Sequence, residues 1–161
     1  MDGRHDFDFL FGRWTVANRK LRNPLDPASD DWDEFAAAVA TQPVVAGLGN
    51  VDRYVAPNFL ERPGFEALAL RLFDPGLASW RIWWASTATP GALDTPVVGR
   101  FSDERGVFEC DDDVEGRSLR VRYEWSGVTS GSPRWEQSFS FDEGAIWQPN
   151  WTMDWRRDPD R

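Results

Sequence analysis

The chain has few of the residues on which protein chemistry most often depends. Among its 161 residues there is one cysteine and one histidine. The single cysteine, Cys110, excludes an internal disulfide and fits a reducing compartment, and its acidic neighbours favour a structural thiol over a reactive one. The single imidazole, His5, lies in an acidic N-terminal segment, where a surface position is the commoner role. Ser126, Ser138 and Ser140 have no histidine partner other than His5, which argues against a serine hydrolase. The sequence predicts no catalytic residues, no metal site and no cofactor.

Positive charge and long apolar runs are also scarce. The chain carries 18 Lys and Arg against 27 Asp and Glu, a net charge of -9. Such a balance opposes binding to nucleic-acid phosphates and to anionic membranes. No apolar run approaches the length of a membrane span, and residues 1–11 are acidic instead of resembling a signal peptide. We therefore expect a cytoplasmic protein with neither a nucleic-acid nor a membrane partner. Its strong preference for Arg over Lys suggests a GC-rich, bacterial coding sequence.

Aromatic residues, by contrast, are abundant. The chain contains ten Trp, eleven Phe and two Tyr, and each such side chain buries roughly 150–250 Å². At this length, one domain over residues 1–161 is the simplest organisation, and it is long enough to bury a substantial core.

The last forty residues, Arg117 to Arg157, show the clearest pattern. Apolar and polar residues alternate there in three consecutive runs separated by turn residues, which predicts antiparallel strands with one aromatic face. The aromatic faces comprise Leu119, Val121, Tyr123 and Trp125 in the first run, Trp135, Gln137, Phe139 and Phe141 in the second, and Trp147, Pro149, Trp151, Met153 and Trp155 in the third.

Shorter alternating segments fill most of the remaining chain. Residues 2–11 predict a helical turn that plugs one end of a barrel, residues 31–46 are interpreted as a strand despite three consecutive alanines, and residues 57–64 and 87–96 are predicted loops. About ten short strands result. The pattern predicts an all-β fold, and we favour an up-and-down antiparallel β-barrel of about ten strands over a sandwich, because closure leaves no exposed edges.

The first predicted strand carries a recognisable motif. Gly12-Arg13-Trp14 resembles the Gly-x-Trp signature of the calycins, the lipocalin-like barrels. The resemblance implies that Trp14 packs at the closed end of the barrel beneath an arginine of the last strand, for which Arg156 and Arg157 are the candidates.

Further segments extend the resemblance over nearly the whole chain. They are Gly47-Leu48-Gly49-Asn50-Val51-Asp52, Val98-Gly99-Arg100-Phe101, Arg120-Val121-Arg122-Tyr123-x-Trp125-Ser126, Trp135-Glu136-Gln137-x-Phe139-Ser140 and Asn150-Trp151-x-Met153. Together they resemble the DUF1579-like group of bacterial proteins, which implies a ten-stranded calycin-like barrel and no established reaction. The related nitrobindins hold haem through a histidine on a late strand. No such histidine is present here, so haem binding does not carry over.

Two interpretations of the aromatic faces remain open, because a shift of one residue in register exchanges the inner and outer sides of a strand. In the first, aromatic side chains line the interior, with two polar anchors, and a small hydrophobic or aromatic ligand binds among them. This interpretation predicts the ligand-binding residues Asn18, Trp84, Tyr123, Trp125, Trp135, Gln137 and Trp151. In the second, the interior is polar and contains a network of Arg120, Arg122, Glu136 and Asn150.

These interpretations lead to three hypotheses of function. We favour the ligand-binding barrel, since the polar interior would leave a very large aromatic surface to be covered. An enzyme using Glu136 or Asp154 beside Arg122 for acid-base chemistry requires the polar interior. The third is a non-catalytic interaction barrel with a filled core, which forms a homodimer around Trp83, a residue on the opposite side of its strand from Trp84.

Overall fold

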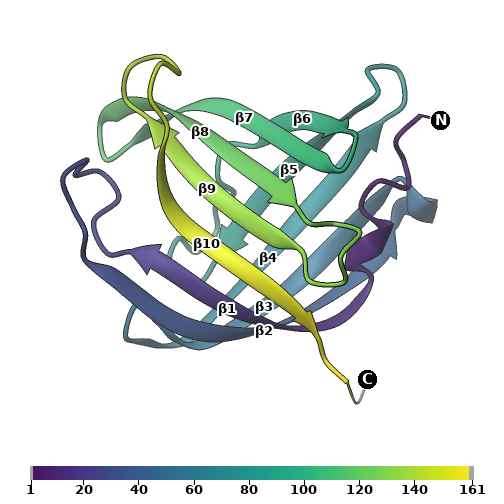
Figure 1. Cartoon of the computed structure of the whole chain (residues 1–161), viewed down its shortest axis with the longest axis horizontal. Coiled ribbons are helices and arrows are strands. Elements are labelled where there is room, and N and C mark those ends of the chain that lie inside the picture. The colour runs from purple at the N-terminus through teal and green to yellow at the C-terminus, as the bar shows by residue number, and fades with distance from the viewer. Residues whose placement is uncertain (1, 160–161) are drawn as a thin grey trace.

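The computed structural model describes residues 2–159 and confirms the predicted fold (Figure 1). Ten antiparallel strands form a closed barrel in which each strand pairs with its neighbours in the sequence, and β1 pairs with β10 to close the wall. The strands are β1 (Gly12–Leu21), β2 (Trp32–Val44), β3 (Gly49–Phe59), β4 (Arg62–Asp74), β5 (Ser79–Ser86), β6 (Val97–Ser102), β7 (Arg105–Val114), β8 (Arg117–Ser126), β9 (Arg134–Ser140) and β10 (Gln148–Arg157). Two short 3-10 turns, η1 (Asp8–Leu10) and η2 (Val45–Gly47), complete the assigned elements.

The alanine-rich segment is part of β2, as predicted. Ala37 faces the core, whereas Ala36 and Ala38 are exposed on the outside of the barrel. Backbone pairing with β1 on one side and β3 on the other holds this segment extended, so tertiary pairing overrides the helical preference of alanine.

The loop predicted for residues 57–64 is wrong. β3 and β4 continue through most of this segment and meet in a tight hairpin in which Phe59 pairs with Arg62. The two residues between them, Leu60 and Glu61, have φ values of 45° and 63°. This left-handed geometry suits a two-residue hairpin turn, but its usual marker, an Asn-Gly or Asp-Gly pair, does not stand at this turn.

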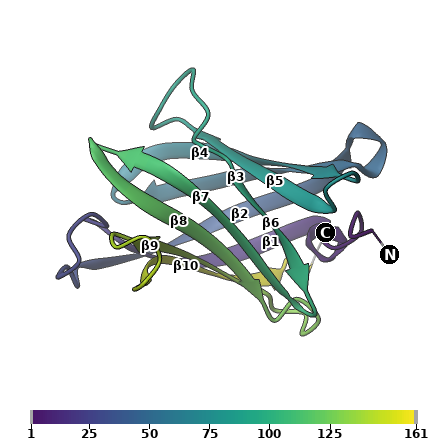
Figure 2. The ribbon, with the colours of Figure 1, turned by 90° about the horizontal axis from the view of Figure 1, so that it is seen from above.

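The N-terminal segment plugs one end of the barrel, as predicted (Figures 1 and 2). The side chains of Phe7 and Leu10 have no exposed surface. The ring of Phe7 makes edge contacts with Trp80 and Phe101, at centroid separations of 4.9 and 5.0 Å. The indole of Trp14 donates a hydrogen bond of 2.8 Å to the carbonyl of Leu10, which fastens the plug to β1.

Arg157, and not Arg156, is the arginine over Trp14. Its guanidinium lies 4.0 Å from the centre of the Trp14 ring and donates hydrogen bonds to the carbonyls of Phe9 and Phe11. The plug, the first strand and the last strand are thereby joined at the seam where the barrel closes.

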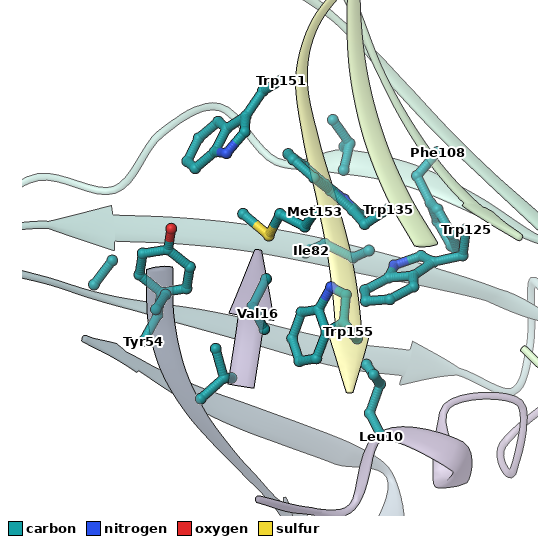
Figure 3. Close-up of a cluster of buried hydrophobic side chains, with 14 of the residues drawn as sticks. Leu10, Val16, Tyr54, Ile82, Phe108, Trp125, Trp135, Trp151, Met153 and Trp155 are labelled. Atoms are coloured by element: carbon teal, nitrogen blue, oxygen red, sulfur yellow. The ribbon is translucent and has the colours of Figure 1, made fainter. Parts of the chain in front are cut away.

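The aromatic faces of the closing strands point inward (Figure 3). Trp125, Trp135 and Trp151 are 1%, 7% and 6% exposed, and Met153 and Trp155 lie beside them in the core. The aromatic interpretation of the interior is therefore the correct one for β8, β9 and most of β10.

A β-bulge interrupts the predicted alternation in β10. The register shifts between Pro149 and Trp151, so that Asn150 is the extra residue. Trp147 and Pro149 consequently do not share the inner face of Trp151, while Asn150 is buried with only 1% of its surface exposed. The prediction of an unbroken third run from residue 147 is wrong for this reason.

Candidate functional site

The seven predicted ligand-binding residues all lie on inward-facing positions of the barrel. Asn18, Trp125, Trp135, Gln137 and Trp151 are buried, whereas Trp84 and Tyr123 are partly exposed.

Five of the inward-facing rings form a continuous aromatic wall. Trp84 packs edge-on against Tyr54 and Trp151, with centroid separations of 5.4 and 5.7 Å. Trp135 contacts Trp151 at 5.3 Å and Tyr123 at 5.0 Å. These edge-to-face contacts hold the rings in fixed mutual orientations, each pair adding about 0.5–1.5 kcal/mol beyond the area that it buries.

The two predicted polar anchors are both engaged with protein groups. The side-chain oxygen of Asn18 accepts hydrogen bonds from the Tyr54 hydroxyl at 2.7 Å and from the Trp151 indole at 3.0 Å. Burial raises the pKa of Tyr54, so its hydroxyl stays protonated and continues to donate. The amide nitrogen of Gln137 donates to Asn150 at 2.8 Å. Asn18 and Gln137 thus first of all orient the aromatic wall.

Sequence reasoning missed a charged cluster inside the barrel. Arg71 on β4 donates to both carboxylate oxygens of Asp52 and, at 2.8 Å, to the side-chain oxygen of Asn50. Thr41 donates to the same carboxylate at 2.8 Å. Arg71 could have been suspected from its register, since it alternates in phase with Ala67 and Ala69, the small residues of the inner face.

A small cavity remains beside this cluster. Its volume is about 30 Å³, and its walls include Arg71, Tyr54, Trp84, Tyr123 and Trp135. That is room for about one or two water molecules. A barrel of ten strands has more interior room than one of eight, but here side chains fill most of it.

Two residues that line this cavity carry unpaired donors. Arg71 Nε and Trp155 Nε1 are buried without a hydrogen-bond partner, and both residues line the cavity. A third unpaired donor, the side-chain nitrogen of Asn150, lies elsewhere in the interior. Since an unsatisfied buried donor costs about 1–3 kcal/mol, the cavity is suited to an occupant that accepts hydrogen bonds.

The barrel wall is incomplete next to the cavity. β5 pairs with β6 only from Trp80 to Ile82, so the rest of β5, including Trp84, has no strand on that side. The loop of residues 87–96 covers this gap. Its Asp94 amide donates to the Trp84 carbonyl at 2.8 Å, and the Cys110 thiol lies 4.0 Å from the Thr95 carbonyl.

The polar set proposed for acid-base chemistry does not form an interior site. Arg122 lies on the outer face, where its guanidinium stacks on Trp147 at 3.8 Å and pairs with Glu124 at 3.3 Å. Glu136 occupies the outward register of β9 and is partly exposed. Asp154 is exposed and forms an ion pair with Arg134. Arg120 forms an ion pair with Asp111. The prediction that Arg122 and Glu136 share a polar interior is wrong, because the closed barrel turns the aromatic face of β8 and β9 inward and the charged face outward. Of the predicted polar set, only Asn150 lies in the interior, and the β-bulge places it there.

Other expected features remain predictions. Trp83 lies in the outward register of β5 and is partly exposed, which leaves the homodimer untested. Within residues 2–159 there is no helix with the length and apolar character needed to cross a membrane. In the same range, no three side chains among His, Cys, Asp and Glu are grouped so as to hold a metal ion.

The fold and this interior define a closed ten-stranded antiparallel barrel with an aromatic core and one buried ion pair. A scan against models of known protein families finds no match for the chain, and neither does a search of curated proteins. The resemblance to the DUF1579-like group therefore stays a prediction.

Proposed function

We propose that the protein binds a small hydrophobic or aromatic molecule inside the barrel, and that the molecule carries a hydrogen-bond acceptor. The observation that carries the proposal is the cavity between the aromatic wall and Arg71, two of whose lining residues, Arg71 and Trp155, have buried donors without partners. A cavity of this size has room for water that accepts from such donors. A ligand acceptor that replaces the water keeps their hydrogen bonds, while the ligand's apolar part packs on the rings.

Binding requires the interior to open. A cavity that takes benzene measures about 150 Å³, several times the space present here. Trp84 and Tyr123 are the two predicted ligand-binding residues that are partly exposed, and the incomplete β5–β6 pairing lies beside Trp84. The ligand enters there, as Trp84 and Tyr123 swing outward and the loop of residues 87–96 moves aside.

Tryptophan fluorescence provides the test, because several indoles surround the cavity. We expect titration with benzonitrile to quench fluorescence saturably and with about three- to tenfold higher affinity than toluene, since one net hydrogen bond contributes about 0.5–1.5 kcal/mol.

A cavity-filling variant separates interior binding from binding to the surface. Ala69 lines the cavity, and Ala69→Val adds two carbons to its wall. Ala38→Val adds the same two carbons on the outer face of β2 and is the matched control. We expect Ala69→Val to weaken benzonitrile binding at least tenfold and Ala38→Val to leave it unchanged. Equal quenching in both variants would refute interior binding.

A further inference from the structure

Lys20 is the only lysine of the chain, against seventeen arginines. It lies near the end of β1 that is opposite the plug, where its cross-strand neighbours are Trp151 on β10 and Asp33 on β2. Directly paired residues of antiparallel strands share a face, so Lys20 points into the barrel as Trp151 does. Its Nζ lies 4.6 Å from the centre of the Trp151 ring.

This amine has no carboxylate partner among residues 2–159. Asp33 is the nearest acidic residue in register, but Arg22 holds it at 3.0 Å. The same guanidinium also pairs with Asp31 of the β1–β2 connection at 3.1 Å and with Glu61 of the β3–β4 turn at 3.5 Å. From β10 the neighbouring side chain is the uncharged indole of Trp151. Lys20 is partly exposed, and the amine lies over the Trp151 ring instead of beside an acid.

Burial without an ion pair makes the neutral amine accessible near physiological pH. Desolvation lowers the pKa of Lys20 to about 8. An arginine at this position would stay protonated and would not act as a nucleophile, because its pKa exceeds about 12. The chain uses arginine at every other cationic position, including the buried Arg71, and has its single lysine beside the Trp151 ring.

We propose that Lys20 is a reversible covalent binding site for aldehydes with an apolar or aromatic body. The neutral Nζ attacks the carbonyl carbon and forms a carbinolamine, the C–O bond then breaks, and the oxygen leaves as water with both hydrogens of the amine. An imine C=N bond remains. The step needs no oxidant or reductant, and water reverses it.

The surroundings of the amine select the class of carbonyl compound. The ring of Trp151 contacts Phe59 at 5.7 Å, and Phe59 contacts Phe35 at 5.0 Å, so the apolar body of an aldehyde packs on aromatic surface. Asp31, Asp33 and Glu61 outnumber the nearby Arg22, which disfavours carboxylate-bearing aldehydes. When the imine becomes protonated, the Trp151 ring stabilises the cation.

The amine does not line the cavity at Arg71. Trp151 belongs to the aromatic wall, but it contacts the cavity-lining Trp84 and Trp135 without itself lining the cavity. Aldehyde capture and binding of benzonitrile can therefore fail independently of one another.

Trapping with borohydride tests the proposal on the full chain. The protein is incubated with benzaldehyde at about pH 7.4, reduced, and mapped by peptide mass spectrometry. At this pH a lysine with a pKa near 8 contains about two hundred times more neutral amine than one at 10.5. Allowing for the lower nucleophilicity of the weaker base, we expect Lys20 to be labelled on the order of tenfold or more faster than N-acetyl-lysine methyl amide.

A double substitution, Arg19→Lys with Lys20→Arg, is the matched control. It moves the single lysine to the outer face. In the native chain the Arg19 guanidinium carbon lies 4.2 Å from the centre of the Trp32 ring there, so an indole stays close to the amine. We expect this variant to be labelled at the rate of the small-molecule amine and with no preference for benzaldehyde over glyoxylate. Equal rates for the two lysine positions, or labelling confined to the N-terminal amine, would overturn the proposal.

Discussion

Arg71 on β4 and Asp52 on β3 form a bidentate ion pair inside the barrel, with N–O distances of 2.7 and 2.6 Å. Both side chains are 4% exposed. The carboxylate also accepts from Thr41, and the guanidinium also donates to Asn50, so each charge has partners beyond the pair. The pair brings a fixed positive group to a cavity otherwise walled mainly by apolar and aromatic side chains, which is why the proposed ligand needs an acceptor.

Breaking this pair should destabilise the fold strongly. We expect Arg71→Met to lower the free energy of unfolding by about 3–5 kcal/mol, because Asp52 is left as an uncompensated buried charge. Urea unfolding of Arg71→Met, Asp52→Leu and the double variant measures the coupling. The free energy of unfolding should fall clearly less in the double variant than the sum of its decreases in the two single variants. Arg53 and Glu66 pair at 2.7 Å on the outside of the same two strands, and Arg53→Met should cause no measurable change. Additive losses at Arg71 and Asp52 would contradict the assigned coupling.

Gly12 should resist substitution because of Arg157. Its φ is +116°, and an added Cβ would lie 2.5 Å from Arg157 Nη1. We expect Gly12→Ala to cost about 1–3 kcal/mol of stability through backbone strain and displacement of the guanidinium from Trp14. Gly47→Ala is the control, since Gly47 also has a positive φ but has nothing near the added Cβ. Thermal unfolding should therefore show the larger loss at Gly12, and a larger loss at Gly47 would show that the Arg157 contact is dispensable.

Cys110 should react slowly with thiol reagents. Burial, and secondarily the charges of Asp112, Asp111 and Asp94, raises the pKa of the Cys110 thiol to about 12. Little thiolate is then present at about pH 8, and we expect Ellman's reagent to modify the folded protein at least a hundredfold more slowly than the urea-unfolded chain. Asp112→Asn should speed the reaction and Asp112→Glu should not. Rapid modification of the folded protein would contradict the assigned environment.

Lys20 should make stability depend on pH in an unusual direction. Its pKa falls from 10.5 to about 8 on folding, so between these values the unfolded chain binds more protons and stability rises with pH. The raised pKa values of Cys110 and Tyr54 act in the opposite direction at alkaline pH, so only a difference between variants isolates the lysine.

Lys20→Met provides that difference. We expect the unfolding free energy of the native chain, measured relative to Lys20→Met in urea at several pH values, to increase from about pH 8 to about pH 10. Lys20→Arg should show no such increase, because arginine does not titrate in this window. A difference that stays flat with pH would mean that Lys20 keeps an ordinary pKa.

The period of two along the chain predicted about ten antiparallel strands, and apolar residues at helical spacing in residues 2–11 predicted the plug. These features follow from local chemistry, because alternating side chains and turn residues specify a pleated strand wherever it pairs. The same periodicity places Trp80, Ile82 and Trp84 on one face of β5, as the structure has them. It also showed that either the aromatic or the charged set of β8 and β9 had to be buried.

Only the tertiary structure decided which face of each strand points inward, where the β-bulge in β10 lies and that Arg71 pairs with Asp52. Closing the barrel buries one face of every strand together, so Trp125, Trp135 and Trp151 turned inward and Arg122 and Glu136 outward. The bulge at Asn150 depends on the register of β9 against β10, which period-two alternation does not encode. Arg71 is buried because Asp52 on the neighbouring strand neutralises it, and such a pairing between residues far apart in sequence exists only once the strands are aligned.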